Sequence, residues 1–198
     1  MAAGVPSFFK NGRLDREGIK HSQIYKYDYL RAETQEYILD KLSELLRRKT
    51  IAGTGQNGTE YKIITIVLDL PKEILRFIQS FDFTKCPPKL IIVNTTETVI
   101  SLEDSIIVAF LNLIGFDIVF FIPTGYDNVS KYYNSQIMEE HIIGNYLYDI
   151  AIPDFNRLRS VKEKKKSFFS RLFAFIPNSF KYFITSLANS LEFNVNSK

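Results

Sequence analysis

The chain has 198 residues, of which 45% are hydrophobic and 24% are charged. These proportions are typical of one folded globular domain with appendages, and they exclude a wholly disordered, collagenous or disulfide-rich chain. The single cysteine, Cys86, has no partner for an internal disulfide, and the sequence contains no CxxC, HExxH or Cys/His cluster for a metal. We therefore expect a reducing, cytoplasmic setting and no metal site.

Neither a targeting segment nor a membrane span is apparent in the sequence. The first fifteen residues lack the basic and apolar regions of a secretory signal, and no stretch reaches the roughly 18 apolar residues of a membrane span. The sequence therefore predicts a protein that is neither exported by that route nor transmembrane.

Charge is distributed unevenly along the chain. From Asn156 onward there are nine basic and two acidic side chains, a net charge of +7, whereas residues 1–155 carry 16 basic and 20 acidic side chains, a net charge of −4. A nucleic-acid-binding body usually has a basic face of its own, so we expect no nucleic-acid partner. The shift in charge divides the chain into a body over residues 1–155 and a basic tail over residues 156–198.

The first 58 residues are predicted to hold an irregular segment and one covering helix. Apolar side chains recur on one face of residues 34–49, which is typical of a helix packed on a core. The glycine-rich stretch over residues 53–58 contains no P-loop lysine and leads into an apolar run instead of following one. We therefore interpret it as a surface loop and not as a phosphate loop.

Three short, continuous apolar runs predict strands that are covered on both faces, over residues 62–68, 89–93 and 117–122. Each is followed by a turn and a helical pattern, over residues 72–81, 104–115 and 129–138. Ser101 and Gly115 are expected to cap the second of these helices, a buried crossover. The alternation predicts successive βαβ units and hence a three-layer, Rossmann-like α/β domain with a short, mainly parallel sheet.

Ligands of open parallel sheets bind beyond the carboxyl ends of the strands, and this places a candidate site after the third run. There Gly125 allows close approach of the backbone, and a helix starting near residue 127 would present free amides to an anion. The pattern predicts a phosphate site formed by Thr124, Gly125, Tyr126, Asp127 and Asn128. An ordinary strand-to-helix turn has the same pattern, and that alternative stays open.

Further polar residues are expected at the other strand ends. The supporting residues are Asp69, Thr95, Thr96 and Glu97. For Asp69, which precedes a helix start, a capping role is favoured over ligand binding. His141 follows two glutamates and is the candidate acid/base group, although a solvated helix-end histidine is the more common case. No nucleophile arrangement is identifiable, so the sequence leaves both enzymatic activity and the cofactor unassigned.

The tail has an amphipathic pattern after its basic run. Aromatic and aliphatic side chains repeat at helical spacing from Phe169 to Leu191, with Pro177 expected to kink the helix. The residues expected to contact a membrane or a partner are Lys164, Lys165, Lys166, Phe169 and Phe173. Packing on the body or on a partner protein is favoured over an anionic membrane surface, because the apolar side would otherwise be a large exposed patch.

Two segments carry a family resemblance, SLEDSIIVAFLNLIGFDIVFFIPTGYDNVSKYY (residues 101–133) and EEHIIGNYLYDIAIPDF (residues 139–155). They resemble the carboxyl-terminal part of the YceG-like bacterial proteins, which are found with tellurium-resistance genes and described as proposed components of a biosynthetic module. The resemblance covers roughly residues 5–160. Members of the family are longer, so the chain resembles a carboxyl-terminal portion or a shortened member.

This resemblance implies a component of a bacterial biosynthetic or stress-response module linked to tellurite resistance. It implies binding of a nucleotide-like or phosphorylated small molecule, and a protein partner encoded in the same gene neighbourhood. The alternative is a non-catalytic interaction protein that docks through its tail on a partner or peripherally on the inner membrane face.

Overall fold

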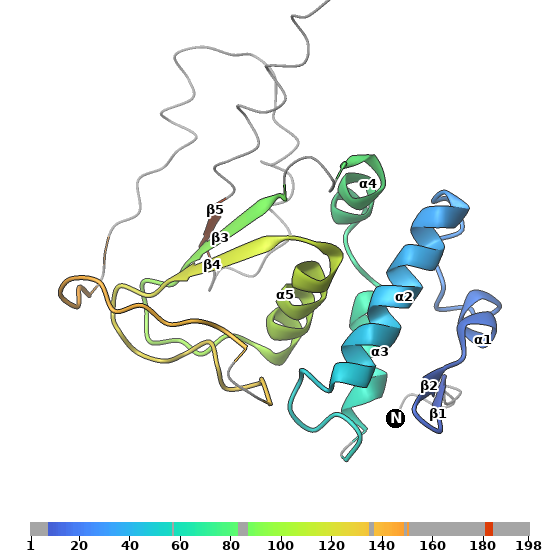
Figure 1. The fold of residues 1–198 in the computed structure, drawn as a ribbon, viewed down its shortest axis with the longest axis horizontal. Helices are drawn as coiled ribbons and strands as arrows, with labels where there is room; N and C mark the ends of the chain where they lie inside the picture. The colour runs from blue at the N-terminus through green and yellow to red at the C-terminus, as the bar shows by residue number, and fades with distance from the viewer. Residues whose placement is uncertain are drawn as a thin grey trace, which may run out of the picture.

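The structure is a computed structural model that describes residues 8–56, 58–82, 87–134, 137–148, 150 and 181–183 (Figure 1). It is a mixed α/β arrangement in which helices lie on one side of a short sheet.

A small hairpin opens the described chain. Strands β1 (Phe9–Lys10) and β2 (Arg13–Leu14) pair antiparallel, and the short helix α1 (Arg16–Lys20) follows. Helix α1 begins after Asp15, whose side chain accepts a hydrogen bond from the backbone N of Gly18 at 2.9 Å. This is an ordinary N-cap.

Three helices follow, α2 (Ala32–Arg48), α3 (Thr59–Val67) and α4 (Lys72–Ser80). Helix α2 confirms the predicted covering helix, and α4 confirms the helix expected over residues 72–81. Both bury one apolar face, as their sequence periodicity predicts.

Helix α3 contradicts the first predicted strand. The apolar run over residues 62–68 lies in and just after this helix, because Ile63, Ile64 and Val67 all fall on one helical face and are buried. Lys62 and Thr65 lie on the exposed side. A short β-branched run suits either a buried strand or a buried helix, and tertiary packing decides between them.

The sheet is built around β3 (Lys89–Val93). It pairs in parallel with β4 (Asp117–Phe121) and antiparallel with β5 (Lys181–Phe183), giving the order β4-β3-β5. The strands predicted at residues 89–93 and 117–122 are thus confirmed, apart from the last residue of the second. Helix α5 (Leu102–Ile114) connects β3 to β4, so the described residues hold one βαβ unit. They do not confirm a three-layer Rossmann-like arrangement.

Both predicted caps of α5 are confirmed. Ser101 Oγ accepts a hydrogen bond from the backbone N of Asp104 at 3.0 Å, and Gly115 ends the helix with a φ of 118°. That φ is in the left-handed region, which glycine adopts without the strain of a β-carbon.

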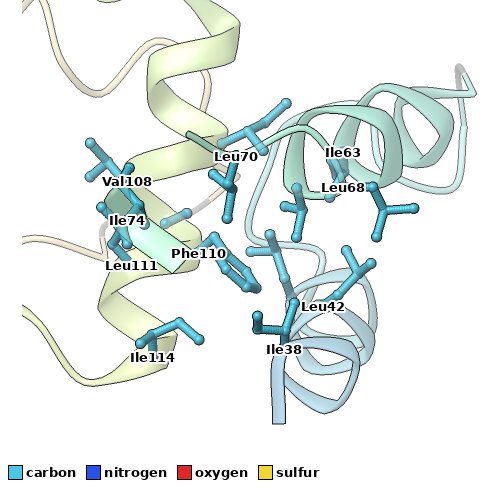
Figure 2. Close-up of a cluster of buried hydrophobic side chains, with 14 of the residues drawn as sticks. Ile38, Leu42, Ile63, Leu68, Leu70, Ile74, Val108, Phe110, Leu111 and Ile114 are labelled. Carbon is cyan, nitrogen blue, oxygen red and sulfur yellow. The ribbon is translucent and has the colours of Figure 1, made fainter. Parts of the chain in front are cut away.

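The hydrophobic core lies where α5 meets α2, α3 and α4 (Figure 2). Phe110 of α5, fully buried, projects toward Ile38 and Leu42 of α2. The core also takes in Leu90 and Ile92 of β3. The crossover helix therefore joins the sheet to the helical side of the protein.

No helix follows β4 over residues 129–134, which corrects the prediction for residues 129–138; residues 135 and 136 lie outside the described part. The segment is held instead by the loop after α2. The backbone N of Ala52 donates to the Tyr132 carbonyl at 2.8 Å, and Asn134 Nδ2 donates to the Lys49 carbonyl at 2.6 Å. An antiparallel bridge joins Ile51 and Tyr133. These long-range bonds replace the local bonds that a helix would make.

The tail, residues 156–198, lies outside the described residues except for β5, which is a strand where a helix was expected. The predicted contact residues Lys164, Lys165, Lys166, Phe169 and Phe173 are all in the undescribed part. Among the helices of the described ranges, none has the length and apolar character needed to cross a membrane.

Candidate functional site

Two loops meet at the carboxyl ends of the parallel strands, residues 94–100 after β3 and residues 122–130 after β4. The backbone N of Asn94 donates to the Phe121 carbonyl at 2.9 Å, and the backbone N of Ile100 donates to the Asn128 carbonyl at 2.9 Å. Asn128 Nδ2 donates to the Thr96 carbonyl at 3.0 Å. The structure therefore brings together the predicted residues of these two strand ends.

Asn94 organises the first loop, a role that the sequence reasoning missed. Its buried Oδ1 accepts hydrogen bonds from the backbone N and the Oγ1 of Thr96, both at 3.1 Å, and its Nδ2 donates to the Thr98 carbonyl at 2.9 Å. An asparagine that bonds to the backbone two residues ahead forms an Asx turn. An asparagine directly after a buried strand was the available signal.

Asn128 and Thr124 are the buried polar residues of the second loop. Asn128 is 0% exposed, and its Oδ1 has no hydrogen-bond partner among the described residues. The Thr124 hydroxyl accepts a long bond, 3.4 Å, from the backbone N of Tyr126. Since buried polar atoms are nearly always hydrogen-bonded, the free acceptor of Asn128 is the least satisfied polar atom of this region.

Gly125 has the positive φ, 67°, that its turn requires, and its N–H donates to the Ile122 carbonyl at 3.0 Å. The group that approaches it closely belongs to the protein itself. A β-carbon at this position would lie 2.0 Å from Cε1 of Tyr146. Next to it, the backbone N of Leu147 donates to the Pro123 carbonyl at 2.8 Å. A later part of the chain therefore covers the turn.

That later part is residues 142–148, which we call the apolar arm. Its large apolar side chains are highly exposed: Ile142 76%, Ile143 86%, Tyr146 59%, Leu147 57% and Tyr148 64%. Such a concentration of exposed apolar side chains marks an interaction surface when it occurs on a folded protein.

The electrostatics of the two loops are acidic. Residues 94–100 and 122–130 contain Glu97 and Asp127 and no lysine or arginine. Asp127 accepts hydrogen bonds from the Oγ of Ser130 at 2.5 Å and from its backbone N at 3.2 Å, and these bonds hold the pKa of Asp127 below its usual range. Asp127 therefore stays ionised. It caps a turn and not a helix, so the expected helix amides are not presented here.

Two other predicted residues, Asp69 and His141, lie outside these two loops. Asp69 follows helix α3 and not a strand, and its exposed carboxylate pairs with Lys26 Nζ at 2.7 Å. The strand-end argument for Asp69 is therefore wrong. Its expected capping role is wrong as well, because α4 begins after Pro71 without a side-chain cap. His141 is exposed, with its Nε2 3.9 Å from a carboxylate oxygen of Glu139, which is also exposed.

The described residues offer no metal-ligand cluster, and they form a hollow far from the strand ends. There, no group of three or more His, Cys, Asp or Glu side chains is placed to hold a metal ion. A hollow of about 530 Å³ lies at the start of α2, away from the strand ends. Its lining residues are Arg31, Glu33, Thr34, Tyr37 and Ile78.

Comparison with known proteins gives a family and one relative. The model of the YceG domain matches residues 5–171. The uncharacterized protein YceG of Bacillus subtilis (strain 168) is 25% identical over 145 residues, which cover 70% of this chain and 27% of that protein. The chain thus spans about a quarter of the length of this curated relative. No solved structure matches the chain.

Proposed function

Because this chain belongs to the YceG domain family, we propose that it is a component of a bacterial biosynthetic or stress-response module linked to tellurite resistance. In this proposal it acts without catalysis, by binding another protein of the module through the apolar arm, residues 142–148. The family resemblance supports the module, and the arm supports the mode of action.

The observation that carries the mode of action is the exposure of Ile142 and Ile143 beside three further exposed apolar residues. Burying a side chain of this kind contributes about 1.5–3 kcal/mol relative to leaving it in water. A partner whose apolar surface covers the arm buries several of these side chains at once, and each of them contributes to the binding free energy. Tyrosine, which the arm supplies as Tyr146 and Tyr148, is also enriched among interaction hot spots.

The arm is held at one end, which favours binding. The bond from Leu147 to the Pro123 carbonyl and the contact of Tyr146 with Gly125 fix it against the strand-end turn. Because part of the arm is already ordered, a partner has less conformational entropy to remove on binding.

The experiment measures binding between the purified full chain and each protein encoded in the same gene neighbourhood. We expect one of them to bind, and Ile143→Asp to weaken that binding at least about tenfold, which corresponds to 1.4 kcal/mol. The control is Tyr61→Asp, which places the same charge at an exposed aromatic residue of α3. Equal affinities of the Ile143→Asp chain and the control would contradict the proposal, as would no binding to any of these proteins.

A second candidate function is binding of a nucleotide-like or phosphorylated small molecule at the strand ends. The free Oδ1 of Asn128 favours it, because a buried acceptor without a partner is suited to a ligand hydroxyl or amino group. The carboxylates of Asp127 and Glu97 make such a group a better partner for these loops than a phosphate. We expect contacts from the sugar or base of the ligand.

Thermal unfolding in the presence of nucleosides, nucleotides and sugar phosphates tests this second function, since a ligand of the native state raises the melting temperature. The expected shift is saturable and is lost in Asn128→Leu. Asn134→Leu is the matched control, because Asn134 ties two loops elsewhere through the Lys49 and Ile51 carbonyls. No shift with any compound, or the same shift in both variants, would exclude a ligand at Asn128.

A further inference from the structure

The described residues leave one apolar face of the sheet partly exposed. Successive residues of a strand point to opposite faces, and the register pairs Ile91 with Val119 and Val93 with Phe121. These four residues form what we call the open face. Val119 is 44% and Phe121 51% exposed, whereas Leu90 and Ile92 on the opposite face are buried in the core.

The open face has a polar limit where β3 and β4 begin. Lys89 Nζ and Asp117 Oδ2 form an ion pair at 2.9 Å where β3 and β4 begin. From there to the carboxyl ends of β3 and β4, the outward residues of these two strands are apolar. The continuous apolar character of both strands is what the sequence predicts for strands covered on both faces.

The order of the strands brings the tail to this sheet. Strands β4 and β5 lie on opposite sides of β3, and Val93 is paired with both Phe121 and Lys181. The end of β4 and the start of β5 are therefore at the same end of the sheet, about 10 Å apart at two strand spacings.

The chain between the end of β4 and the start of β5 is much longer than this separation requires. Roughly three extended residues span 10 Å, whereas residues 151–180 provide thirty. The part that directly precedes β5, residues 168–180, contains Arg171 as its only charged residue. Its large apolar side chains are Phe168, Phe169, Leu172, Phe173, Phe175, Ile176 and Phe180.

We propose that residues 168–180 of the same chain pack on the open face of the β3–β4 sheet. Their length, their apolar composition and their attachment at β5 beside β3 all fit this occupant. The packing gives the sheet a second covering layer, as a three-layer arrangement requires. Because this packing buries the apolar side chains of residues 168–180 against the sheet, these side chains are not the surface that contacts a membrane or a partner. The inference is independent of the apolar arm.

Disulfide trapping in the full chain tests this packing. In a Cys86→Ser background, Val119→Cys is combined in turn with Phe169→Cys, Phe173→Cys and Ile176→Cys. We expect mild oxidation to give an intramolecular disulfide in at least one of these pairs. Tyr61→Cys replaces Val119→Cys in the control set, which we expect to give none. Absence of disulfides from the Val119→Cys set, equal yields in both sets, or disulfides only between molecules would each overturn the proposal.

Hydrogen exchange gives a second measurement that needs no new cysteine. Phe173→Asp is expected to speed amide exchange in β4 about tenfold, because loss of a covering segment lowers local stability. Phe193→Asp, which lies in the tail after β5, is expected to leave that exchange unchanged. Equal exchange in the two variants would contradict the packing.

Lipid vesicles test the alternative that residues 168–180 bind a membrane surface instead of the sheet. Adding vesicles of equal parts phosphatidylglycerol and phosphatidylcholine should leave the yield of the Val119→Cys disulfide unchanged. If the vesicles abolish the disulfide while the chain binds them, a lipid surface is the preferred partner of the segment and the proposal is wrong.

Discussion

The ring of Tyr146 lies so close to Gly125 that a β-carbon at position 125 would sit 2.0 Å from its Cε1 atom. The contact joins two segments that are 21 residues apart, the turn after β4 and the apolar arm. With the bond from Leu147 to the Pro123 carbonyl, it makes the strand-end turn and the arm one structural unit.

Gly125→Ala should therefore release the arm. The substitution adds the cost of a left-handed backbone for a residue with a β-carbon, about 1 kcal/mol, and it forces the Tyr146 ring to move. We expect faster hydrogen exchange at Leu147, whose N–H is bonded to Pro123, as measured by mass spectrometry.

Gly144→Ala is the matched control for this prediction. Gly144 also has a positive φ, 75°, but nothing lies within 4 Å of the position its β-carbon would take. Gly144→Ala should therefore lower the stability through the cost of its backbone conformation, but it should leave hydrogen exchange at Leu147 unchanged. If both variants alter exchange at Leu147 equally, the Tyr146 contact does not hold the arm.

Tyr27→Phe should destabilise the helical part of the protein. The buried Tyr27 hydroxyl donates to the Val67 carbonyl at 2.5 Å and accepts from the backbone N of Leu70 at 2.9 Å. Its removal leaves both backbone groups unpaired in the core, which costs about 1–3 kcal/mol of unfolding free energy. Urea denaturation measures the change. Tyr25→Phe, which removes a half-buried bond to Gln35, should cost less.

Stability should fall at alkaline pH. Burial raises the pKa of both Tyr27 and Tyr133, and their folded-state pKa values therefore exceed the value of about 10 in an unfolded chain. The stability they contribute is fully present below that unfolded value and is lost as the pH rises through the folded one. The variant with Tyr27→Phe and Tyr133→Phe should lose less unfolding free energy between about pH 9 and pH 11. A loss equal to that of the unsubstituted chain would contradict the assignment.

Ser101→Ala should destabilise α5. The side chain accepts from the backbone N of Asp104 at 3.0 Å and donates to its Oδ2 at 2.6 Å. Loss of such an N-cap typically costs about 0.5–2 kcal/mol. Ser101→Thr retains the hydroxyl and should remain close to the original stability in thermal denaturation. Equal stability of the two variants would show that the cap contributes little.

Caps, apolar periodicity and apolar runs, which can be recognised within a short stretch of sequence, predicted several elements correctly. The caps at Ser101 and Gly115 mark the two ends of α5. The apolar periodicity of residues 34–49 and 72–81 correctly predicted α2 and α4. The parallel pair β3 and β4 followed from two apolar runs separated by that crossover helix.

The errors came from long-range contacts. Residues 62–68 are helical because one face of α3 packs in the core, and residues 129–134 are irregular because loop 49–52 takes their hydrogen bonds. At the strand ends, the sequence identified the turn at Gly125 but not the Tyr146 ring that covers it. Contacts of this kind depend on the tertiary arrangement and leave no periodic pattern.

Site-specific photocrosslinking tests whether the chain binds a protein through its apolar arm. A photoreactive phenylalanine analogue is placed at Ile143 in one strain and at Tyr61 in another, in cells that express the chain at its native level. We expect one discrete adduct from Ile143, with a protein of the same gene neighbourhood, and none from Tyr61. No adduct at Ile143, or the same adducts at both positions, would contradict binding through the arm.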